Sequence, residues 1–412
     1  NREWFIMNML DIITKKKNKE VLTHEELSYA FNGYLNKEIP DYQMTSLLMA
    51  IVINGLTFEE TFDLTKIFID SGETFKFDKK VCDKHSTGGI GDTVTLVAIP
   101  VLGALNIPVV KMSGRGLGIT GGTIDKLESI PGFNVNLTKE DYYNNLEKIG
   151  VVVGAQTNDL VPLDKVIYAL RDVSGTTESI PLIASSIMSK KIACGADYIL
   201  IDVKWGSGAL VKTKKDAVVL SNYLIEIGKR FNREVKTIIS DMNEPLSTCI
   251  GNALEVEEAI NVLKGEKNKL RETSLEVVGN LASMYLNISY EEAYNRASEV
   301  LDNNKAYEMF KTWISSQGGD LSKLKISDKV ILIKSNQDGI ISHINALKVG
   351  ELSVKLGAGR ITKDSKIDYS VGIKLLKQSG DSVKKGDILA KLYVNDLNIK
   401  LNKDDINFYS VK

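Results

Sequence analysis

Residues 82–92 read CDKHSTGGIGD and concentrate a lysine, a histidine, two hydroxyl side chains and three glycines in one short stretch. Because glycine has no Cβ, these glycines let backbone N–H groups turn inward and approach a ligand closely. The apolar run that follows predicts a helix beginning near Gly91, whose positive N-terminal end would attract an anion. Further donors to phosphate oxygens would come from Lys84, Ser86, Thr87 and Thr93. The stretch therefore predicts an anion site on a strand, a loop and a helix, with a plain glycine-rich turn as the alternative.

A second glycine-rich stretch, KMSGRGLGITGGT at residues 111–123, follows another short apolar run and precedes a short helical segment. Hydroxyl donors stand near its two ends, at Ser113 and Thr123. Two such loops after neighbouring strands predict that one anion is held from two sides. The G-x-G-x-x-G spacing of a dinucleotide site also occurs here, at Gly116, Gly118 and Gly121. The helix after it ends before Pro131, which is too short for an ordinary crossover and disfavours that alternative.

The rest of the chain indicates helices first and then an alternating α/β pattern. Residues 8–72 read as helices, and Thr23-x-x-Glu26 and Thr57-x-x-Glu60 are capping boxes at two of the helix starts. From about residue 79, short apolar runs alternate with helical segments, which is typical of a largely parallel sheet covered by helices. The predicted strands are 80–83, 107–112, 150–154, 197–203 and 234–240, and the predicted helices between them include 92–104, 139–148 and 213–231.

The C-terminal part of the chain differs in composition. Residues after Pro245 read as helical to about Gly318, whereas the tail at 329–412 is rich in Ile, Val, Lys, Gly and Asp with short strands. Its segment 380–387, GDSVKKGD, predicts a hairpin like that of a biotinyl or lipoyl domain. A carrier domain would present a modifiable lysine in a Met-Lys-Met or Asp-Lys-Ala motif, and neither motif occurs. We therefore interpret the tail as a structural module, with a carrier domain as the alternative.

Composition limits the class of function. At 412 residues the chain is long enough for two or three domains, and its 43% hydrophobic and 25% charged residues are typical of a globular protein. A net charge of −1 argues against nucleic acid as a partner, and three dispersed cysteines suit a reducing cytoplasm. We find no signal peptide or membrane span in the sequence. Residues 1–6 precede Met7, a more natural start, and are left out of the fold prediction.

Several long motifs, in the same order along the chain, resemble those of the thymidine and pyrimidine-nucleoside phosphorylases. They are KHSTGG at 84–89, SGRG at 113–116, GGTIDKLE at 121–128, YALRD at 168–172, IPLIASSIMSKK at 180–191 and NALEV at 252–256. The residues around Lys111 and in 92–95 resemble the pyrimidine-nucleoside branch more than the strict thymidine branch. Two positions depart from the family: Ile119, where a histidine is common, and Trp205, which replaces a small residue. These departures bear on substrate preference more than on the reaction.

The resemblance implies an α/β multidomain fold. A small all-α domain, formed by 1–70 with 162–193, would carry the base-binding side and the dimer contact. A large α/β domain with a mainly parallel central sheet, formed by 71–161 with 194–328, would bind phosphate. The C-terminal domain, 329–412, would be α+β and contain the biotinyl/lipoyl-like hairpin module.

The family further implies the reversible phosphorolysis of pyrimidine nucleosides (uridine, thymidine, deoxyuridine) to free base and (deoxy)ribose 1-phosphate, in nucleoside salvage. Matched residue by residue, the phosphate ligands would be Lys84, Ser86, Thr95, Lys111, Ser113 and Thr123. The base ligands would be Arg171, Ser186 and Lys190. Ser186 and Lys190 are four residues apart on one predicted helix and therefore on one face. The catalytic residues would be His85, Arg171 and Lys190, with His85 donating a hydrogen bond or proton as the base leaves.

The pyrimidine-nucleoside members of the family also hold a potassium ion. The matching positions are Gly91, Thr93, Leu246, Cys249 and Glu258. The resemblance implies phosphate as co-substrate, no organic cofactor, a homodimer, and neither nucleic acid nor a membrane as partner. Two alternatives stay open: a phosphoribosyltransferase of the anthranilate type, and a protein of the same fold that only binds nucleosides.

Overall fold

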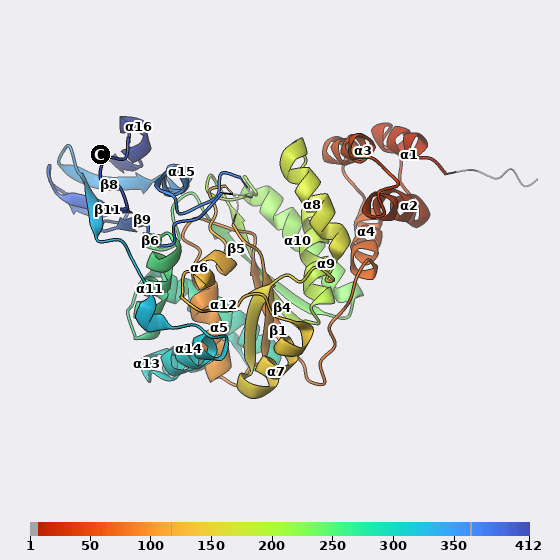
Figure 1. The fold of residues 1–412 in the computed structure, drawn as a ribbon. Helices are drawn as coiled ribbons and strands as arrows, with labels where there is room; N and C mark the ends of the chain where they lie inside the picture. Colours follow the sequence, from red (N-terminus) through yellow and green to blue (C-terminus); the bar gives the residue numbers. More distant parts are fainter. Residues whose placement is uncertain (1–6, 117, 363–364) are drawn as a thin grey trace, which may run out of the picture. The chain divides into compact units, whose positions relative to one another are not determined.

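The computed structural model describes residues 7–116, 118–362 and 365–412 (Figure 1), so the expectation for residues 1–6 lies outside the described residues. The chain forms two compact units. The first contains the described residues up to 80 together with 157–199 and 218–235. The second contains the described residues of 81–156, 200–217 and 236–412.

The first unit is built from helices. Its first four are α1 (Met9–Lys17), α2 (His24–Leu35), α3 (Asp41–Asn54) and α4 (Phe58–Asp70), which lie together in Figure 1. The predicted capping boxes at Thr23 and Thr57 are both confirmed. Two later helices, α8 (Pro162–Ser174) and α9 (Ile180–Ala193), join them, and α10 (Lys214–Arg230) contributes most of its length. The small helical domain expected from the sequence is therefore present.

Buried polar contacts tie the helices of this unit together. Lys16 Nζ of α1 lies 2.7 Å from Glu60 Oε1 of α4, and both side chains are almost completely buried. Thr65 Oγ1 of α4 donates to Ser185 Oγ of α9 at 3.2 Å. Because each of these buried polar atoms has a partner, the contacts fix the helix register without leaving an uncompensated charge.

The second unit is organised around a five-stranded sheet with the order β3-β2-β1-β4-β5. The strands are β1 (Cys82–Ser86), β2 (Val109–Ser113), β3 (Val151–Ala155), β4 (Tyr198–Trp205) and β5 (Glu234–Asp241). The pairs β1–β2 and β2–β3 are parallel, so the predicted parallel sheet is confirmed. All five predicted strands occur, with their bounds shifted by a few residues. Helix α5 (Val94–Ala104) connects β1 to β2, and α6 (Thr123–Glu128) and α7 (Lys139–Ile149) lie between β2 and β3.

Helix α5 forms the centre of this unit. Every residue from Val94 to Gly103 is buried, because α5 packs against strands β2 and β3 on one side and against later helices on the others. The later helices are α11 (Asn252–Leu263), α12 (Lys269–Leu286), α13 (Tyr290–Asp302) and α14 (Lys305–Ser316), followed by the short helix η1 (Leu321–Lys323). A helix buried on all sides explains why the sequence shows an apolar run there and no helical periodicity.

The described residues of the C-terminal part form two helices and, together with one strand from residues 249–250, two small sheets. A four-stranded sheet has the order β6-β9-β11-β7, and a three-stranded sheet has the order β10-β8-β12. Their strands are β6 (Cys249–Ile250), β7 (Lys329–Lys334), β8 (Gly339–Ile344), β9 (Gly372–Leu375), β10 (Ser382–Val383), β11 (Ile388–Val394) and β12 (Tyr409–Val411), and the helices are α15 (Ala346–Leu356) and α16 (Lys403–Ile406).

The segment 380–387 has a different local structure from the paired hairpin that the sequence suggested. Strand β10 pairs with β8, whereas β11 pairs with β7 and β9, so this segment connects two sheets. A turn closes it, in which the Asp387 backbone N–H donates to Lys384 O at 3.0 Å. The C-terminal α+β module itself, with its antiparallel strands, is present as expected.

Candidate functional site

The first glycine loop connects the carboxyl end of β1 to the start of α5. Gly88 and Gly91 have φ angles of +98° and +69°, a region that disfavours residues with a Cβ. A Cβ at Gly91 would also lie only 2.8 Å from Ser247 Oγ, so glycine is required there for space as well. Helix α5 begins at Val94, slightly later than the sequence suggested, and its first N–H groups face the end of this loop. The loop thus has the backbone geometry of an anion site.

Lys84 is the buried cation of this loop. Its side chain is 1% exposed, and its Nζ lies 3.5 Å from Thr95 Oγ1 and 4.0 Å from Asp92 Oδ1. Burial lowers the pKa of Lys84, while the carboxylate of Asp92 opposes that shift. A buried ammonium with distant counter-charges attracts a further anion strongly, because no water screens it. Lys84 and Thr95 are therefore brought together as the sequence predicted.

Asp92 lies between Lys84 and a second buried lysine that the sequence analysis missed. Lys204 Nζ is 3.9 Å from Asp92 Oδ2 and 2.6 Å from Asp202 Oδ2, and the Lys204 side chain is completely buried. Burial would raise the pKa of Asp92, but Lys84, Lys204 and Lys126 outweigh it and hold that pKa well below its usual range. Burial likewise disfavours the charged form of Lys204, and Asp92 and Asp202 raise its pKa overall.

The second glycine loop starts where β2 ends, at Ser113, and finishes where α6 begins, at Thr123. Lys111 on β2 connects the two strands, since its Nζ donates to Lys84 O at 2.6 Å. The parallel strands β1 and β2 therefore place Ser86 and Ser113 at the same edge of the sheet. These are two of the hydroxyl donors that the family resemblance matches to phosphate.

The second loop folds back on itself in a way that argues against a dinucleotide site. The backbone N–H of Gly116 donates to Asp125 Oδ2 at 2.7 Å and so is already engaged within the protein. A Cβ at Gly116 would lie 2.6 Å from the Gly122 backbone nitrogen. These glycines therefore allow two backbone segments of the loop to pack closely against each other. Helix α6 spans only Thr123–Glu128, far shorter than the crossover helix that a dinucleotide fold needs.

His85 is the next residue after Lys84 on β1 and is partly buried. It lies in the second unit with the two glycine loops. Consecutive strand residues point to opposite faces, so the side chains of His85 and Lys84 leave β1 on different sides. Lys84 can therefore contact an anion while His85, from the same strand, contacts a different chemical group.

The oxygens matched to a potassium site partly converge. Ser247 Oγ lies 2.5 Å from Gly91 O and 3.1 Å from Cys249 O, so these two carbonyls face one point. Thr93 Oγ1 is 3.5 Å from the same oxygen of Gly91. The carboxylate of Glu258 accepts bonds from two backbone N–H groups of the same turn, at 3.0 and 2.7 Å. Hard carbonyl and hydroxyl oxygens are the donors that suit a weakly bound alkali ion, so this residue set fits one.

Leu246 ties the same segment to the first glycine loop, because its backbone N–H donates to Ile90 O at 3.0 Å. Burial raises the pKa of Glu258, although its bonds from Thr248 and Cys249 favour the ionised form. A cation beside this carboxylate would offset the cost of burying its charge. Among the described residues, no group of three or more His, Cys, Asp or Glu side chains could hold a metal ion, so any ion here would depend on backbone and hydroxyl oxygens.

The residues predicted to bind the base lie in the first unit, on α8 and α9. Lys190 Nζ donates to Ser186 Oγ at 2.8 Å, which confirms that these residues share one face of α9. The same Nζ lies 2.6 Å from Asp164 Oδ2 on α8. The sequence did not indicate a role for Asp164, because a single carboxylate on a helix gives no recognisable pattern. Its buried Oδ1 has no hydrogen-bond partner in the described part of the chain, so this carboxylate retains capacity for one more donor.

Arg171 is buried on α8, and part of its planar guanidinium group already donates hydrogen bonds within the protein. Its Nε donates to Thr176 O at 3.0 Å and its Nη2 to Thr177 O at 2.8 Å. Burial lowers the pKa of Arg171, and the charge persists because arginine titrates far above neutrality. The half-exposed ring of Tyr168, which begins the YALRD motif but was given no role from the sequence, lies 5.9 Å both from the Arg171 guanidinium and from Lys190 Nζ. The group thus combines two cations, a carboxylate, a hydroxyl and an aromatic face.

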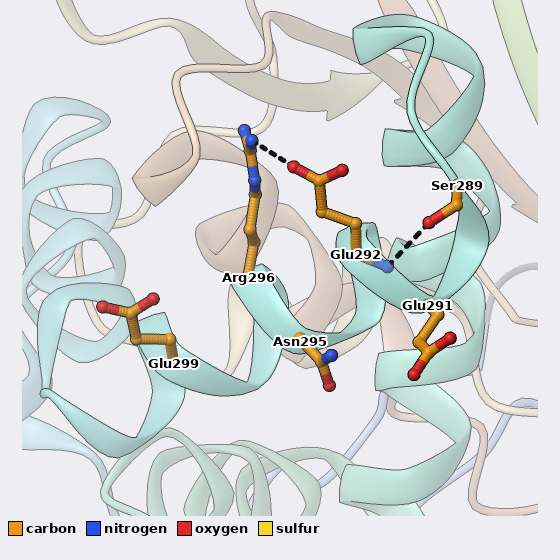
Figure 2. A pocket seen from close by; sticks show the side chains of 6 residues that line it. All are labelled: Ser289, Glu291, Glu292, Asn295, Arg296 and Glu299. Atoms are coloured by element: carbon orange, nitrogen blue, oxygen red, sulfur yellow. Dashed lines mark hydrogen bonds and ion pairs between the residues drawn. The ribbon is translucent and has the colours of Figure 1, made fainter.

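A surface hollow on α13 is unrelated to these groups. It has a volume of about 330 Å³ and is lined by Ser289, Glu291, Glu292, Asn295, Arg296 and Glu299. Figure 2 shows the Arg296 guanidinium directed at the carboxylate of Glu292, while the other carboxylates point elsewhere. Arg296 Nη2 lies 2.5 Å from Glu292 Oε1. The acidic lining contains none of the residues predicted to bind phosphate or base.

Comparison with known proteins gives three matching family models. Residues 78–307 match the a/b domain of a glycosyl transferase family, and residues 10–72 match the helical bundle domain of that family. Residues 340–406 match the pyrimidine nucleoside phosphorylase C-terminal domain. None of the described helices is long and apolar enough to cross a membrane.

Curated relatives match nearly the whole chain. The pyrimidine-nucleoside phosphorylase of Bacillus subtilis (strain 168) is 48% identical, over 95% of this chain and 93% of that protein. The pyrimidine-nucleoside phosphorylase of Geobacillus stearothermophilus is 47% identical, over 94% of this chain and 92% of that protein. Among solved structures, anthranilate phosphoribosyltransferase from Thermus thermophilus matches with a TM-score of 0.62 and 17% identity, covering 74% of this chain and 99% of that one. At this level of identity, the likeness to the Thermus thermophilus structure shows a shared fold alone.

Proposed function

This chain belongs to the pyrimidine-nucleoside phosphorylase family of glycosyl transferases, and we propose that it catalyses the reversible phosphorolysis of pyrimidine nucleosides. Uridine, thymidine and deoxyuridine would give the free base and (deoxy)ribose 1-phosphate, in nucleoside salvage. The observation that carries this proposal is the 48% identity to one such enzyme over 95% of the chain.

The phosphate side of the reaction rests on the second unit. Phosphate is bound by Lys84 and Lys111 and by the hydroxyl groups at the strand and helix ends: Ser86, Thr95, Ser113 and Thr123. Support comes from the buried ammonium of Lys84, 3.5 Å from Thr95 Oγ1, and from the glycine loop before α5. Fixed donors of this kind stabilise an attacking anion without reorganising during the reaction.

The base side rests on the first unit. Arg171, Ser186 and Lys190 donate hydrogen bonds to the carbonyl oxygens and ring edge of the pyrimidine. Support comes from the Lys190–Ser186 contact at 2.8 Å and from Asp164, which orients the ammonium of Lys190 at 2.6 Å. As the C1′–N1 bond breaks, negative charge develops on the pyrimidine, and two cations stabilise that charge more than they stabilise the neutral nucleoside.

His85 donates a hydrogen bond or a proton to the leaving pyrimidine. Imidazole titrates near neutral pH and can serve either role. Potassium is held at the positions Gly91, Thr93, Leu246, Cys249 and Glu258, which border the first glycine loop. When bound, the ion supplies positive charge that favours phosphate in the adjoining loop.

The protein acts as a cytoplasmic homodimer whose contact lies on the helical domain. Exposed apolar side chains on the first helices support a protein–protein contact there, since Tyr42 and Ile53 are both 73% exposed. A homodimer would also agree with the apolar character of α3, which has buried residues on several sides. Light scattering of the purified protein measures this state directly.

Incubation with uridine and phosphate, followed by chromatography, tests the reaction. We expect free uracil and ribose 1-phosphate, and no uracil when phosphate is omitted. A parallel incubation with anthranilate and phosphoribosyl pyrophosphate tests the alternative that the fold likeness raises. Uracil released only with phosphate would support the proposal. Product from the anthranilate mixture alone would instead favour a phosphoribosyltransferase, and binding of uridine without turnover would favour a nucleoside-binding protein.

A further inference from the structure

Arg360 comes from the C-terminal part of the chain and reaches the second glycine loop. It follows α15, which is capped by Gly357 with a φ of +104°, so the chain turns sharply toward that loop. The Arg360 side chain is 12% exposed, and its Nη1 lies 2.7 Å from Asp125 Oδ1, whose carboxylate is 2% exposed. A partly buried arginine–carboxylate pair holds its geometry more firmly than a fully exposed pair, because few alternative partners exist.

The contacts of Arg360 fix the backbone of the loop at several points. Nη1 donates to Gly116 O at 3.2 Å, while the Gly116 N–H donates to the carboxylate of Asp125 at 2.7 Å. The carbonyl oxygen of Arg360 accepts the backbone N–H of Gly118 at 3.0 Å. One arginine and one aspartate therefore hold both peptide groups of Gly116 and the amide of Gly118.

The segment that carries Arg360 is itself tied to the second unit. Asn252 Nδ2, at the start of α11, donates to Ala358 O at 2.9 Å. A Cβ at Gly350 of α15 would lie 2.6 Å from Ile90 Cδ1 and 3.0 Å from Ile119 Cβ, so α15 packs closely on both glycine loops. Burial raises the pKa of Asp125, against the effects of Gly116 and Arg360, which indicates how strongly the site is shielded from water. The C-terminal module thus contacts the loops that the proposed function assigns to phosphate.

We propose that Arg360 is a positioning residue for phosphate: through Gly116, Gly118 and Asp125 it sets the shape of the loop that carries Ser113 and Thr123. Arg360 acts through the loop and touches no substrate. The C-terminal module would then contribute to the reaction in addition to stabilising the fold. This inference rests on the proposed phosphorolysis, but the loop geometry can be measured without it.

Replacement of Arg360 by methionine, which keeps the aliphatic stem, tests the inference. In Arg360→Met we expect the KM for phosphate to rise about tenfold while the KM for uridine stays within about twofold, because a charge-assisted contact is lost on the phosphate side only. Arg360→Lys keeps the charge without the fork and should recover part of the loss. Lys355→Met is the matched control, since Lys355 pairs at the surface with Asp405 at 2.5 Å, and it should change neither KM.

Hydrogen exchange of the backbone amides gives a readout independent of turnover. The amides of Gly116 and Gly118 should exchange faster in Arg360→Met than in the wild-type protein, with the β3 amides unchanged. An equal rise in both KM values together with a lowered Tm would overturn the inference. An unchanged KM for phosphate together with unchanged amide exchange would overturn it as well. If the wild-type protein released no uracil, the proposed function would fail, and phosphate binding measured by calorimetry in both proteins would still decide the role of Arg360.

Discussion

The two groups of predicted ligands differ in how they hold their cations. On the phosphate side, Lys84 is 1% exposed and its nearest carboxylate oxygen, on Asp92, is 4.0 Å away. On the base side, Lys190 is 26% exposed and lies 2.6 Å from its carboxylate on Asp164. A buried cation without a direct counter-ion is suited to capture a small, highly charged anion. A directly paired and partly hydrated cation is suited to directional hydrogen bonds with a nearly neutral ring.

The largest expected effect comes from breaking the buried charges on the phosphate side. Asp92→Asn leaves Lys84 and Lys204 with less compensation, so we expect a loss of about 3–5 kcal/mol in the free energy of unfolding. Phosphate turnover should fall as well, because Asp92 would no longer fix the two buried lysines beside the first glycine loop. Thermal unfolding and steady-state kinetics measure both. Asp405→Asn, which breaks a surface pair of Lys355, is the control, and an equal effect there would mean that burial is unimportant.

The next largest effect, on the kinetics with uridine, concerns the planar guanidinium group of Arg171. Arg171→Lys keeps a positive charge but cannot donate to both Thr176 O and Thr177 O in the observed geometry. We expect kcat/KM for uridine to fall by about tenfold to a hundredfold, the cost of losing a charged hydrogen bond. The KM for phosphate should stay near the wild-type value. Near-normal uridine kinetics would show that Arg171 has a structural role alone.

A smaller effect should follow from Asp164→Asn. The amide would still accept a hydrogen bond from Lys190 but would lose the ionic part of the 2.6 Å contact. We expect the KM for uridine to rise about threefold to tenfold, because a partly exposed ion pair contributes roughly 1 kcal/mol. Thermal unfolding should change little. A loss of stability as large as that of Asp92→Asn would contradict the distinction drawn between the two groups.

The smallest effect is a change with pH. Burial lowers the pKa of Lys84, so its ammonium loses its proton at a lower pH than an exposed lysine would. The cation is present at low pH and is lost as pH rises through that pKa, so affinity for phosphate should fall on the alkaline side. The KM for phosphate, measured from pH 7 upward, should therefore rise in the wild-type protein. In Lys84→Gln this alkaline rise should disappear, and its persistence would assign it to another group.

Local patterns in the sequence were sufficient for most of the fold. The capping threonines, the apolar runs and the glycine loops each identify an element from neighbouring residues, and the five strands of the sheet follow from them. The segment 380–387 could not be predicted in the same way, because its turn residues indicate a turn but not which strands pair. Strands β10 and β11 pair with different sheets, and that choice depends on packing far along the chain.

The same limit applies to the candidate site. Lys84 and Ser86 belong to a recognisable motif, but Asp92 meets Lys204 only because β1 and β4 are neighbours in the sheet. Arg360 meets Gly116 through a contact between residues far apart in the sequence. Charged residues at such positions look like ordinary surface charges until the fold brings them together. The roles assigned to the matched ligands, and the domain bounds expected from the family, stay predictions.

One measurement tests directly whether phosphate and base are held by separate sets of residues. The KM values for phosphate and for uridine should be measured in both Lys84→Gln and Lys190→Gln. We expect Lys84→Gln to raise the KM for phosphate about tenfold to a hundredfold and leave that for uridine nearly unchanged, and Lys190→Gln to do the reverse. Equal changes in both KM values for either variant, or a rise for the opposite substrate, would contradict the account.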